Sequence, residues 1–277
     1  MKQFLLTAVF AGLFFSLNAQ QLKTPQPSPT QTIKQDFGLG TIELSYSRPS
    51  MKGRKVFGDL VPFNAVWRTG ANSATTVTFS DEVTIGGTKV AAGKYGLLSI
   101  PSANEWTIII TKQLDVTSPA AYKQESDVVR VIAKPMQLPM TIETFTANFG
   151  NITNNSCELH LFWEQTLVSL PITTDVDGKV MAQIDNIFNK DNRPYYGAAV
   201  YYADNGKDLN KAIEWFDKAI AQNPNAFWVH YQKAKALAKA GRKSEALEAS
   251  KKSMELAKAQ KNSDYVTLNE KLQKDLK

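Results

Sequence analysis

The chain has 277 residues, which is enough for two domains of roughly 100 to 200 residues each. Its formal net charge of +6 is uneven, because residues 20–178 carry 13 cationic and 14 anionic side chains whereas residues 179–277 carry 18 and 12. A basic excess on lysine-rich segments is typical of solvated helix faces, and the sequence has no zinc-finger or RNP-type motif, so we expect no nucleic-acid partner. The single cysteine, Cys157, excludes an intramolecular disulfide.

The first 19 residues have the pattern of a secretory signal peptide. Lys2 precedes an apolar run from Phe4 to Leu17, and the small residue Ala19 provides a cleavage point. The run is shorter than the about 20 apolar residues that a transmembrane helix needs, and no cysteine follows it to carry a lipid. We therefore expect export to the periplasm or beyond it, a soluble mature chain and no membrane span.

Residues 20–30 contain three prolines and no apolar periodicity, which predicts an extended, mobile leader. Short runs with β-strand alternation follow, separated by Gly, Pro and Asn turns at the spacing typical of an antiparallel β-sandwich. Gly86 and Gly87 supply the tight turn of one hairpin. We assign residues 31–177 to this sandwich, with strands expected at 32–37, 41–47, 75–79, 83–90, 94–100, 106–111, 127–133, 142–149, 157–164 and 167–173.

One long interruption, residues 46–72, is called here the basic loop. Between Arg48 and Arg68 it holds five cations and one anion, with aromatic residues interleaved. A guanidinium fork matches carboxylate or phosphate, and an aromatic ring offers a face to a sugar. We hypothesise a site for an anionic or carbohydrate ligand at Arg48, Arg54, Trp67, Arg68 and Asn72. The alternative is a structural brace, in which the arginines donate to backbone carbonyls and Trp67 fills the core.

The basic loop and its neighbours also resemble a known family. The segments SRPS, KGR, FGDLVP, WRTGAN, TTVTFS, VAAGKYGLLSIP and EWTIII occur in order, and residues 29–173 are together similar to a family of secreted bacterial domains of unknown function, number 2911. The resemblance implies an exported domain with no established activity. It therefore assigns no functional residue.

The periodicity changes to helical near Asp177, so residues 178–277 form a second, α-helical domain. Ala212, Phe216, Ala219 and Pro224 have the spacing of the second half of a tetratricopeptide repeat, and Ala246 follows Ala212 by 34 residues. This part resembles divergent tetratricopeptide repeats with one residue inserted after Gly206. The fold class is thus a β-sandwich followed by a small tetratricopeptide-like domain.

The repeats also depart from the family pattern. Val200 stands where a small residue is usual, and Lys233 and Ser250 stand where large apolar residues are usual. Such repeats offer a groove to a protein partner or to the chain's own β domain. We place this interaction at Tyr196, Trp215, Trp228 and Tyr231. The alternative is that these aromatics at helical spacing are core.

The sequence contains no strong catalytic signature. The two histidines, His160 and His230, fall in different domains without metal-ligand spacing, and nucleophile-elbow, phosphate-loop and dinucleotide motifs are missing. We expect no cofactor and no metal. The sequence favours an exported, non-catalytic binding or interaction protein; the alternative is a hydrolase of envelope glycans or peptides that uses carboxylates near the basic loop.

Overall fold

The computed structural model describes residues 24–188 and 194–276, so the predicted signal peptide lies outside the described residues. The chain divides into two compact units that meet between Asp175 and Val176, two residues before the boundary expected from the sequence. They are called the β unit and the helical unit, and each is described by itself. In the described ranges, no helix combines the length and the apolar character needed to cross a bilayer.

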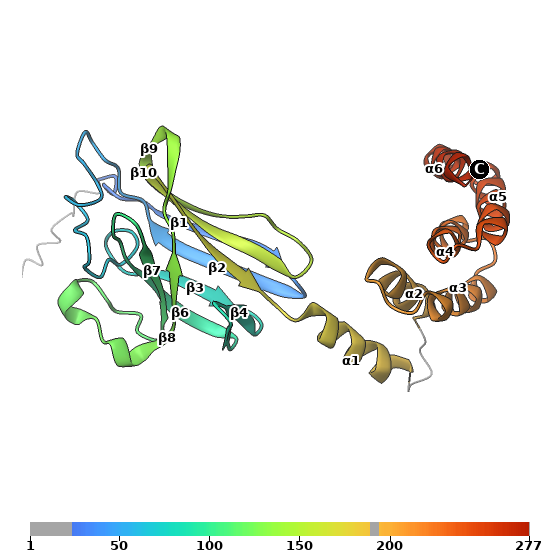
Figure 1. The fold of residues 1–277 in the computed structure, drawn as a ribbon, viewed down its shortest axis with the longest axis horizontal. Coiled ribbons are helices and arrows are strands. Elements are labelled where there is room, and N and C mark those ends of the chain that lie inside the picture. The colour runs from blue at the N-terminus through green and yellow to red at the C-terminus, as the bar shows by residue number, and fades with distance from the viewer. Residues whose placement is uncertain (1–23, 189–193, 277) are drawn as a thin grey trace, which may run out of the picture. The chain divides into compact units, whose positions relative to one another are not determined.

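The described part of the β unit forms two antiparallel sheets (Figure 1). The larger sheet has the strand order β1-β2-β3-β6-β7-β8, and the smaller has the order β5-β4-β10-β9. The strands are β1 (Thr30–Phe37), β2 (Gly40–Ser47), β3 (Thr75–Phe79), β4 (Val83–Ile85), β5 (Thr88–Val90), β6 (Gly93–Ile100), β7 (Trp106–Thr111), β8 (Asp127–Ala133), β9 (Met136–Gly150) and β10 (Ser156–Thr173).

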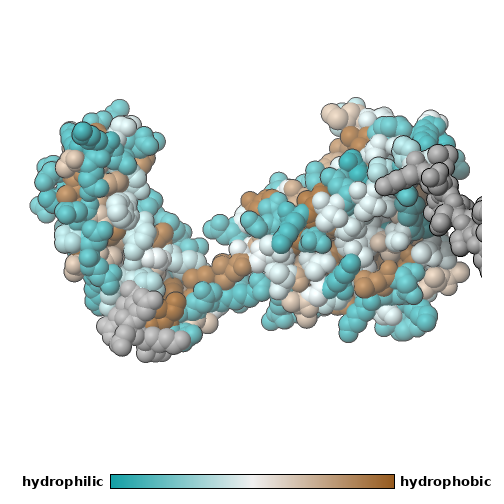
Figure 2. Space-filling model, turned by 180° about the vertical axis from the view of Figure 1, so that it is seen from behind, coloured by the Kyte–Doolittle hydropathy of each residue, from teal (hydrophilic) through white to brown (hydrophobic). Residues whose placement is uncertain are grey.

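The core lies between the two sheets, as expected for a sandwich. Strand alternation directs Ile42 and Leu44 of β2 to the same side, and both are fully buried with Leu159 of β10 in one hydrophobic cluster. In the view of Figure 2, hydrophobic side chains on the surface of the β unit are interspersed with hydrophilic ones. The β-sandwich prediction is therefore confirmed.

The last two strands are longer than the sequence indicates. β9 begins at Met136 rather than at residue 142, so the strand includes Pro139. Proline has no backbone N–H to donate, and it is tolerated here because β9 lies at the edge of its sheet. The predicted strands 157–164 and 167–173 are one strand, β10, whose pairing with β9 shifts register on both sides of Glu164. Glu164 has a φ of 54°, so an irregularity inside the strand takes the place of the expected turn.

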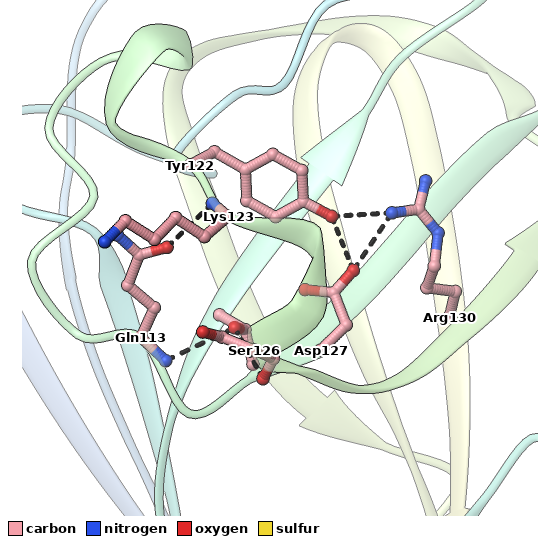
Figure 3. A network of polar contacts seen from close by, with 7 residues as sticks. Gln113, Tyr122, Lys123, Ser126, Asp127 and Arg130 are labelled. Atoms are coloured by element: carbon pink, nitrogen blue, oxygen red, sulfur yellow. Dashed lines mark hydrogen bonds and ion pairs between the residues drawn. The ribbon is translucent and has the colours of Figure 1, made fainter.

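A polar cluster closes the segment between β7 and β8 (Figure 3). Tyr122 donates a hydrogen bond of 2.5 Å to Oδ2 of Asp127, and Arg130 Nη1 donates to the same oxygen at 3.0 Å and to the Tyr122 hydroxyl at 2.6 Å. The side chain of Asp127 is only 7% exposed. Burial, followed by the bond to Asp127, raises the pKa of Tyr122 to about 12.

In the helical unit, each helix from α2 to α6 packs against the next along the chain (Figure 1). Asp208 caps α3 by accepting from the backbone N–H groups of Asn210 and Lys211, and Asn262 caps α6 by accepting from that of Tyr265. Small residues such as Ala199 and Ala212 are fully buried between the helices and let them approach closely. The helices are α1 (Val176–Phe188), α2 (Tyr195–Asp204), α3 (Leu209–Gln222), α4 (Phe227–Lys239), α5 (Lys243–Ala259) and α6 (Ser263–Asp275).

A buried polar network explains why Ser250 departs from the apolar repeat pattern. Ser250 donates to Oδ1 of Asn269 at 2.9 Å, and Nδ2 of Asn269 donates to Ser253 at 2.9 Å. Ser253 in turn donates to the Phe227 carbonyl at 2.8 Å. All three polar side chains are fully buried. Hydrogen bonds therefore join α4, α5 and α6 where the repeat pattern would place apolar contacts.

Candidate functional site

The basic loop runs from the end of β2 to the start of β3 and is fixed near its C-terminal end by a short backbone pairing. Trp67 and Ser99 exchange two backbone hydrogen bonds of 2.7 and 2.9 Å. Thr69, which has a φ of 51°, is fully buried and interacts through its hydroxyl with Ser99 at 2.9 Å. A β-branched residue rarely adopts this conformation, so the surrounding bonds impose it.

Trp67 lies mainly in the core, being 9% exposed. Its ring stacks on Trp163 at a centroid distance of 5.8 Å and meets Phe145 edge-on at 5.2 Å. Its indole N–H donates to the Gly70 carbonyl at 3.0 Å. Trp67 therefore anchors the basic loop to the aromatic core, as the brace alternative requires.

The three arginines all donate to backbone carbonyls. Arg48 reaches the Phe145 carbonyl at 3.2 Å and the Thr146 hydroxyl at 2.8 Å, so it ties the start of the loop to β9. Arg54 donates to the carbonyls of Met51 at 2.8 Å and of Ser50 at 2.9 Å. These bonds are the ones that a bracing role predicts.

Arg68 and Asn72 fix two further segments. Arg68 Nη1 donates to the Thr117 carbonyl in the segment between β7 and β8. Asn72 Nδ2 donates to the Ser28 carbonyl at 3.1 Å and to the Ser47 hydroxyl at 3.2 Å. The end of the predicted mobile leader is thus pinned to the loop, while residues 20–23 lie outside the described residues.

Three of the five predicted ligand-binding residues nevertheless line one hollow, called here the arginine cleft. Arg54, Trp67 and Arg68 border a volume of about 430 Å³, whereas Arg48 and Asn72 are not among its lining residues. The remaining walls are mostly apolar and small. They comprise Ser28, Pro49, Leu60, Val61, Pro62, Ala65, Val66, Gly70, Ala71, Thr117, Ser118, Pro119 and Trp163.

Two carboxylates near the basic loop accept hydrogen bonds from its backbone N–H groups. Glu143 accepts a hydrogen bond of 2.9 Å from the backbone N–H of Lys52, and Glu164 accepts one of 3.4 Å from that of Phe57. Among the described residues that line the arginine cleft, none is an Asp or a Glu. The cleft itself therefore holds no pair of acid groups.

The four predicted partner-binding aromatics of the helical unit differ in how far they are exposed. Trp215 is only 5% exposed and stacks on Phe188 of α1 at 4.6 Å, so its assignment to a partner surface is corrected to the core. Trp228 is half-buried against Phe227. Tyr196 is 36% exposed on α2, and Tyr231 is partly exposed on α4.

The sequence analysis missed a third tyrosine, Tyr265, which contacts one of these two. Tyr265 of α6 contacts Tyr231 edge-on at 5.5 Å. It follows Tyr231 by 34 residues, and Tyr196 precedes Tyr231 by 35, which is one repeat plus the inserted residue. The three residues, called here the tyrosine row, therefore occupy equivalent positions in successive first helices, and the repeat spacing was the signal that could have found Tyr265.

The tyrosine row lies on the inner layer of the helical unit. Figure 1 shows α2, α4 and α6 forming this layer, with α3 and α5 behind them. Burial, and the nearby Tyr265 phenol, raise the pKa values of Tyr196 and Tyr231. Within the described part of the chain, none of the three hydroxyls has a hydrogen-bond partner.

The remaining candidates for chemistry have structural environments. His160 Nε2 lies 2.9 Å from Glu158, and His230 Nε2 lies 3.0 Å from the Pro224 carbonyl. Burial raises the pKa of the Cys157 thiol to about 11. Across residues 24–188 and 194–276, no three His, Cys, Asp or Glu side chains cluster closely enough to hold a metal ion.

Comparisons with known proteins agree with the two-part architecture. A tetratricopeptide repeat model matches residues 215–248, which run from α3 into α5. No curated protein and no solved structure matches the chain. The model of a protein family of unknown function, DUF2911, matches residues 28–172, more than half of the sequence, so the chain belongs to this family.

Proposed function

We propose that the protein is an exported, non-catalytic interaction protein whose helical unit binds an extended segment of a protein partner along the tyrosine row. The observation that carries the proposal is the alignment of Tyr196, Tyr231 and Tyr265 at equivalent repeat positions on the inner layer. A tyrosine contributes a large rigid ring and a hydroxyl at low cost in conformational entropy, which is why binding surfaces are enriched in it.

The surroundings of the tyrosine row favour a partner that carries a carboxylate. Lys235 of α4 lies over the ring of Tyr231 at 5.9 Å and donates to Gln232 at 3.1 Å. It has no carboxylate partner within the described residues, unlike Lys233, which pairs with Asp217 at 2.5 Å. We therefore expect the bound segment to combine an apolar side chain that packs on the rings with an acidic group near Lys235.

A peptide selection tests this function. Random peptides displayed on phage are selected on the mature chain, residues 20–277, and the enriched peptide is synthesised for calorimetry. We expect Tyr231→Ala to weaken its binding at least tenfold, as truncation of a central aromatic contact does, and Lys235→Gln to weaken the binding of acidic sequences. Lys251→Gln, on an exposed position of α5, is the matched control and should bind as wild type does.

Two results would contradict the proposal. One is a selection that enriches no peptide above background. The other is an enriched peptide that binds Tyr231→Ala and wild type equally, which would place its contact away from the tyrosine row.

Export is the second part of the proposal and is supported by the pattern of residues 1–19. In a Gram-negative host that expresses the full chain, the mature protein should appear outside the cytoplasm with its new N-terminus at residue 20. Mass spectrometry of the fractionated protein measures that N-terminus. A full-length chain that still begins at Met1 in the cytoplasm would show that the segment is not processed.

A further inference from the structure

We propose that the arginine cleft of the β unit binds a small organic carboxylate with an apolar body. This inference is independent of the tyrosine row, since it concerns the other unit. The cleft volume of about 430 Å³ falls within the range of small-molecule sites, which are mostly apolar with a few polar groups that orient the ligand.

The positive charge of the cleft favours a ligand with an anionic group. Its two charged lining residues in the described chain are Arg54 and Arg68. Each guanidinium has five N–H donors; Arg54 uses Nε and Nη2 for backbone carbonyls, and Arg68 uses Nη1. Nη1 of Arg54 and both Nε and Nη2 of Arg68 have no partner among the described residues. These remaining donors match the two oxygens of a carboxylate.

The bracing bonds prepare this site rather than exclude it. The carbonyls of Met51, Ser50 and Thr117 fix the two guanidinium groups before any ligand arrives. The backbone next to Arg68 is also constrained, because Thr69 is fully buried with a φ of 51°. A ligand therefore loses less affinity to the ordering of these long side chains.

The apolar walls of the cleft favour an apolar body in the rest of the ligand. Leu60 is 39% exposed, and Pro62 and Pro119 are also exposed, so an apolar group finds accessible surface. The two tryptophans present little ring face, because Trp67 is 9% and Trp163 is 2% exposed. This argues against a carbohydrate, which would need an open ring face for stacking, and in favour of an acid whose body packs on the aliphatic walls.

Binding of phenylacetate and hexanoate to the mature chain, measured by calorimetry, tests the inference. We expect saturable binding of at least one of them, with a Kd on the order of 1 mM or below. Phenylacetamide, which has the same shape as phenylacetate without the charge, should bind at least tenfold more weakly. Acetate and inorganic phosphate should also bind more weakly, because they lack the apolar body.

Two lysine variants locate the site. Arg68→Lys keeps the charge and one donor for the Thr117 carbonyl but loses the fork, and we expect at least fivefold weaker binding. Arg242→Lys makes the same chemical change in the helical unit, outside the cleft, and should leave the affinity unchanged. If Arg68→Lys does not fold, Arg54→Lys replaces it, because Arg54 is exposed.

Several outcomes would overturn the inference. One is no saturable binding of either acid, and another is equal binding of phenylacetate and phenylacetamide. A third is tighter binding of phosphate than of both acids. The last is an Arg68→Lys variant, or its Arg54→Lys replacement, that binds the acid with the same affinity as wild type.

Discussion

The two units bury very different kinds of side chain. The β unit gathers Trp67, Trp106 and Trp163 with Phe57 and Phe145 into one aromatic cluster, in which neighbouring ring centroids lie 4.8 to 6.2 Å apart. The helical unit buries mostly alanines, with a few larger side chains such as Trp215 and Phe216 and a network of two serines and an asparagine. Large rings fill the broad space between two sheets, whereas small residues let helices pack closely.

This difference affects how each unit presents a surface. In the β unit Trp67 packs into the aromatic cluster, so the basic loop is held in place and two of its arginines, Arg54 and Arg68, border a cleft. In the helical unit the tyrosine row of α2, α4 and α6 remains partly at the surface. A rigid loop suits a small ligand, and a row of repeated side chains suits an extended segment.

The largest expected effect comes from removing the centre of the aromatic cluster. Trp163→Ala should lower the free energy of unfolding of the β unit by about 3–5 kcal/mol, because it deletes a buried indole that the surroundings cannot replace. Urea unfolding followed by near-ultraviolet and far-ultraviolet circular dichroism measures the two units together. Leu39→Ala, at a residue that is 50% exposed, is the control. If Trp163→Ala lowers the helical transition equally, the two cores are not independent.

A smaller effect is expected from the polar network of the helical unit. Asn269→Ala should cost about 1–3 kcal/mol, because it removes the buried hydrogen bonds through which Asn269 of α6 joins Ser250 and Ser253 of α5. Thermal unfolding monitored at 222 nm measures the loss, with Glu270→Ala on the exposed face of α6 as the control. An unchanged melting temperature would mean that the network contributes nothing to holding α5 and α6 together.

Loss of a brace in the basic loop should have an effect of similar size. Arg48→Ala removes the hydrogen bonds to β9 and should cost about 1.5–3 kcal/mol, with partial recovery in Arg48→Lys. Lys55→Ala, at an exposed position of the same loop, should change stability by less than about 0.5 kcal/mol. Chemical unfolding of the three variants compares them. Equal stabilities of Arg48→Ala and Lys55→Ala would show that Arg48 does not brace the loop.

The pH dependence of the β unit offers a milder probe. Because the folded state raises the pKa of Tyr122 from 10 to about 12, the unfolded state loses this proton first. The stabilisation from Tyr122 is therefore complete below pH 10 and is lost as the pH rises from about 10 to about 12. Melting temperatures across this range should fall less steeply in Tyr122→Phe than in wild type. Parallel curves would show that Tyr122 does not contribute to the alkaline loss.

The smallest expected signal is the reaction of the native thiol. Cys157 is 1% exposed, and its pKa is raised to about 11, so the folded β unit should not react with iodoacetamide at pH 8. Mass spectrometry should detect alkylation only when urea opens the β unit. Rapid labelling without urea would indicate that the core around β10 opens frequently.

The candidate sites were only partly predictable from the sequence. The grouping of cations in the basic loop indicated where a cleft would lie, and Arg54, Trp67 and Arg68 do line one. The same pattern could not separate them from Arg48, whose partner Phe145 is 97 residues away. Trp215 and Tyr231 both have helical spacing, yet packing buries the first and leaves the second partly exposed.

The sequence by itself determined what depends on neighbouring residues. Alternation at a period of two, tight-turn glycines and the 34-residue repeat are local patterns, and they predicted the sandwich, the hairpin at Gly86-Gly87 and the helical pairs. The tertiary structure decided which polar groups meet across the fold. It joined β10 into one strand, placed Ser250 in a buried network and closed the arginine cleft, because each depends on contacts between segments far apart in the chain.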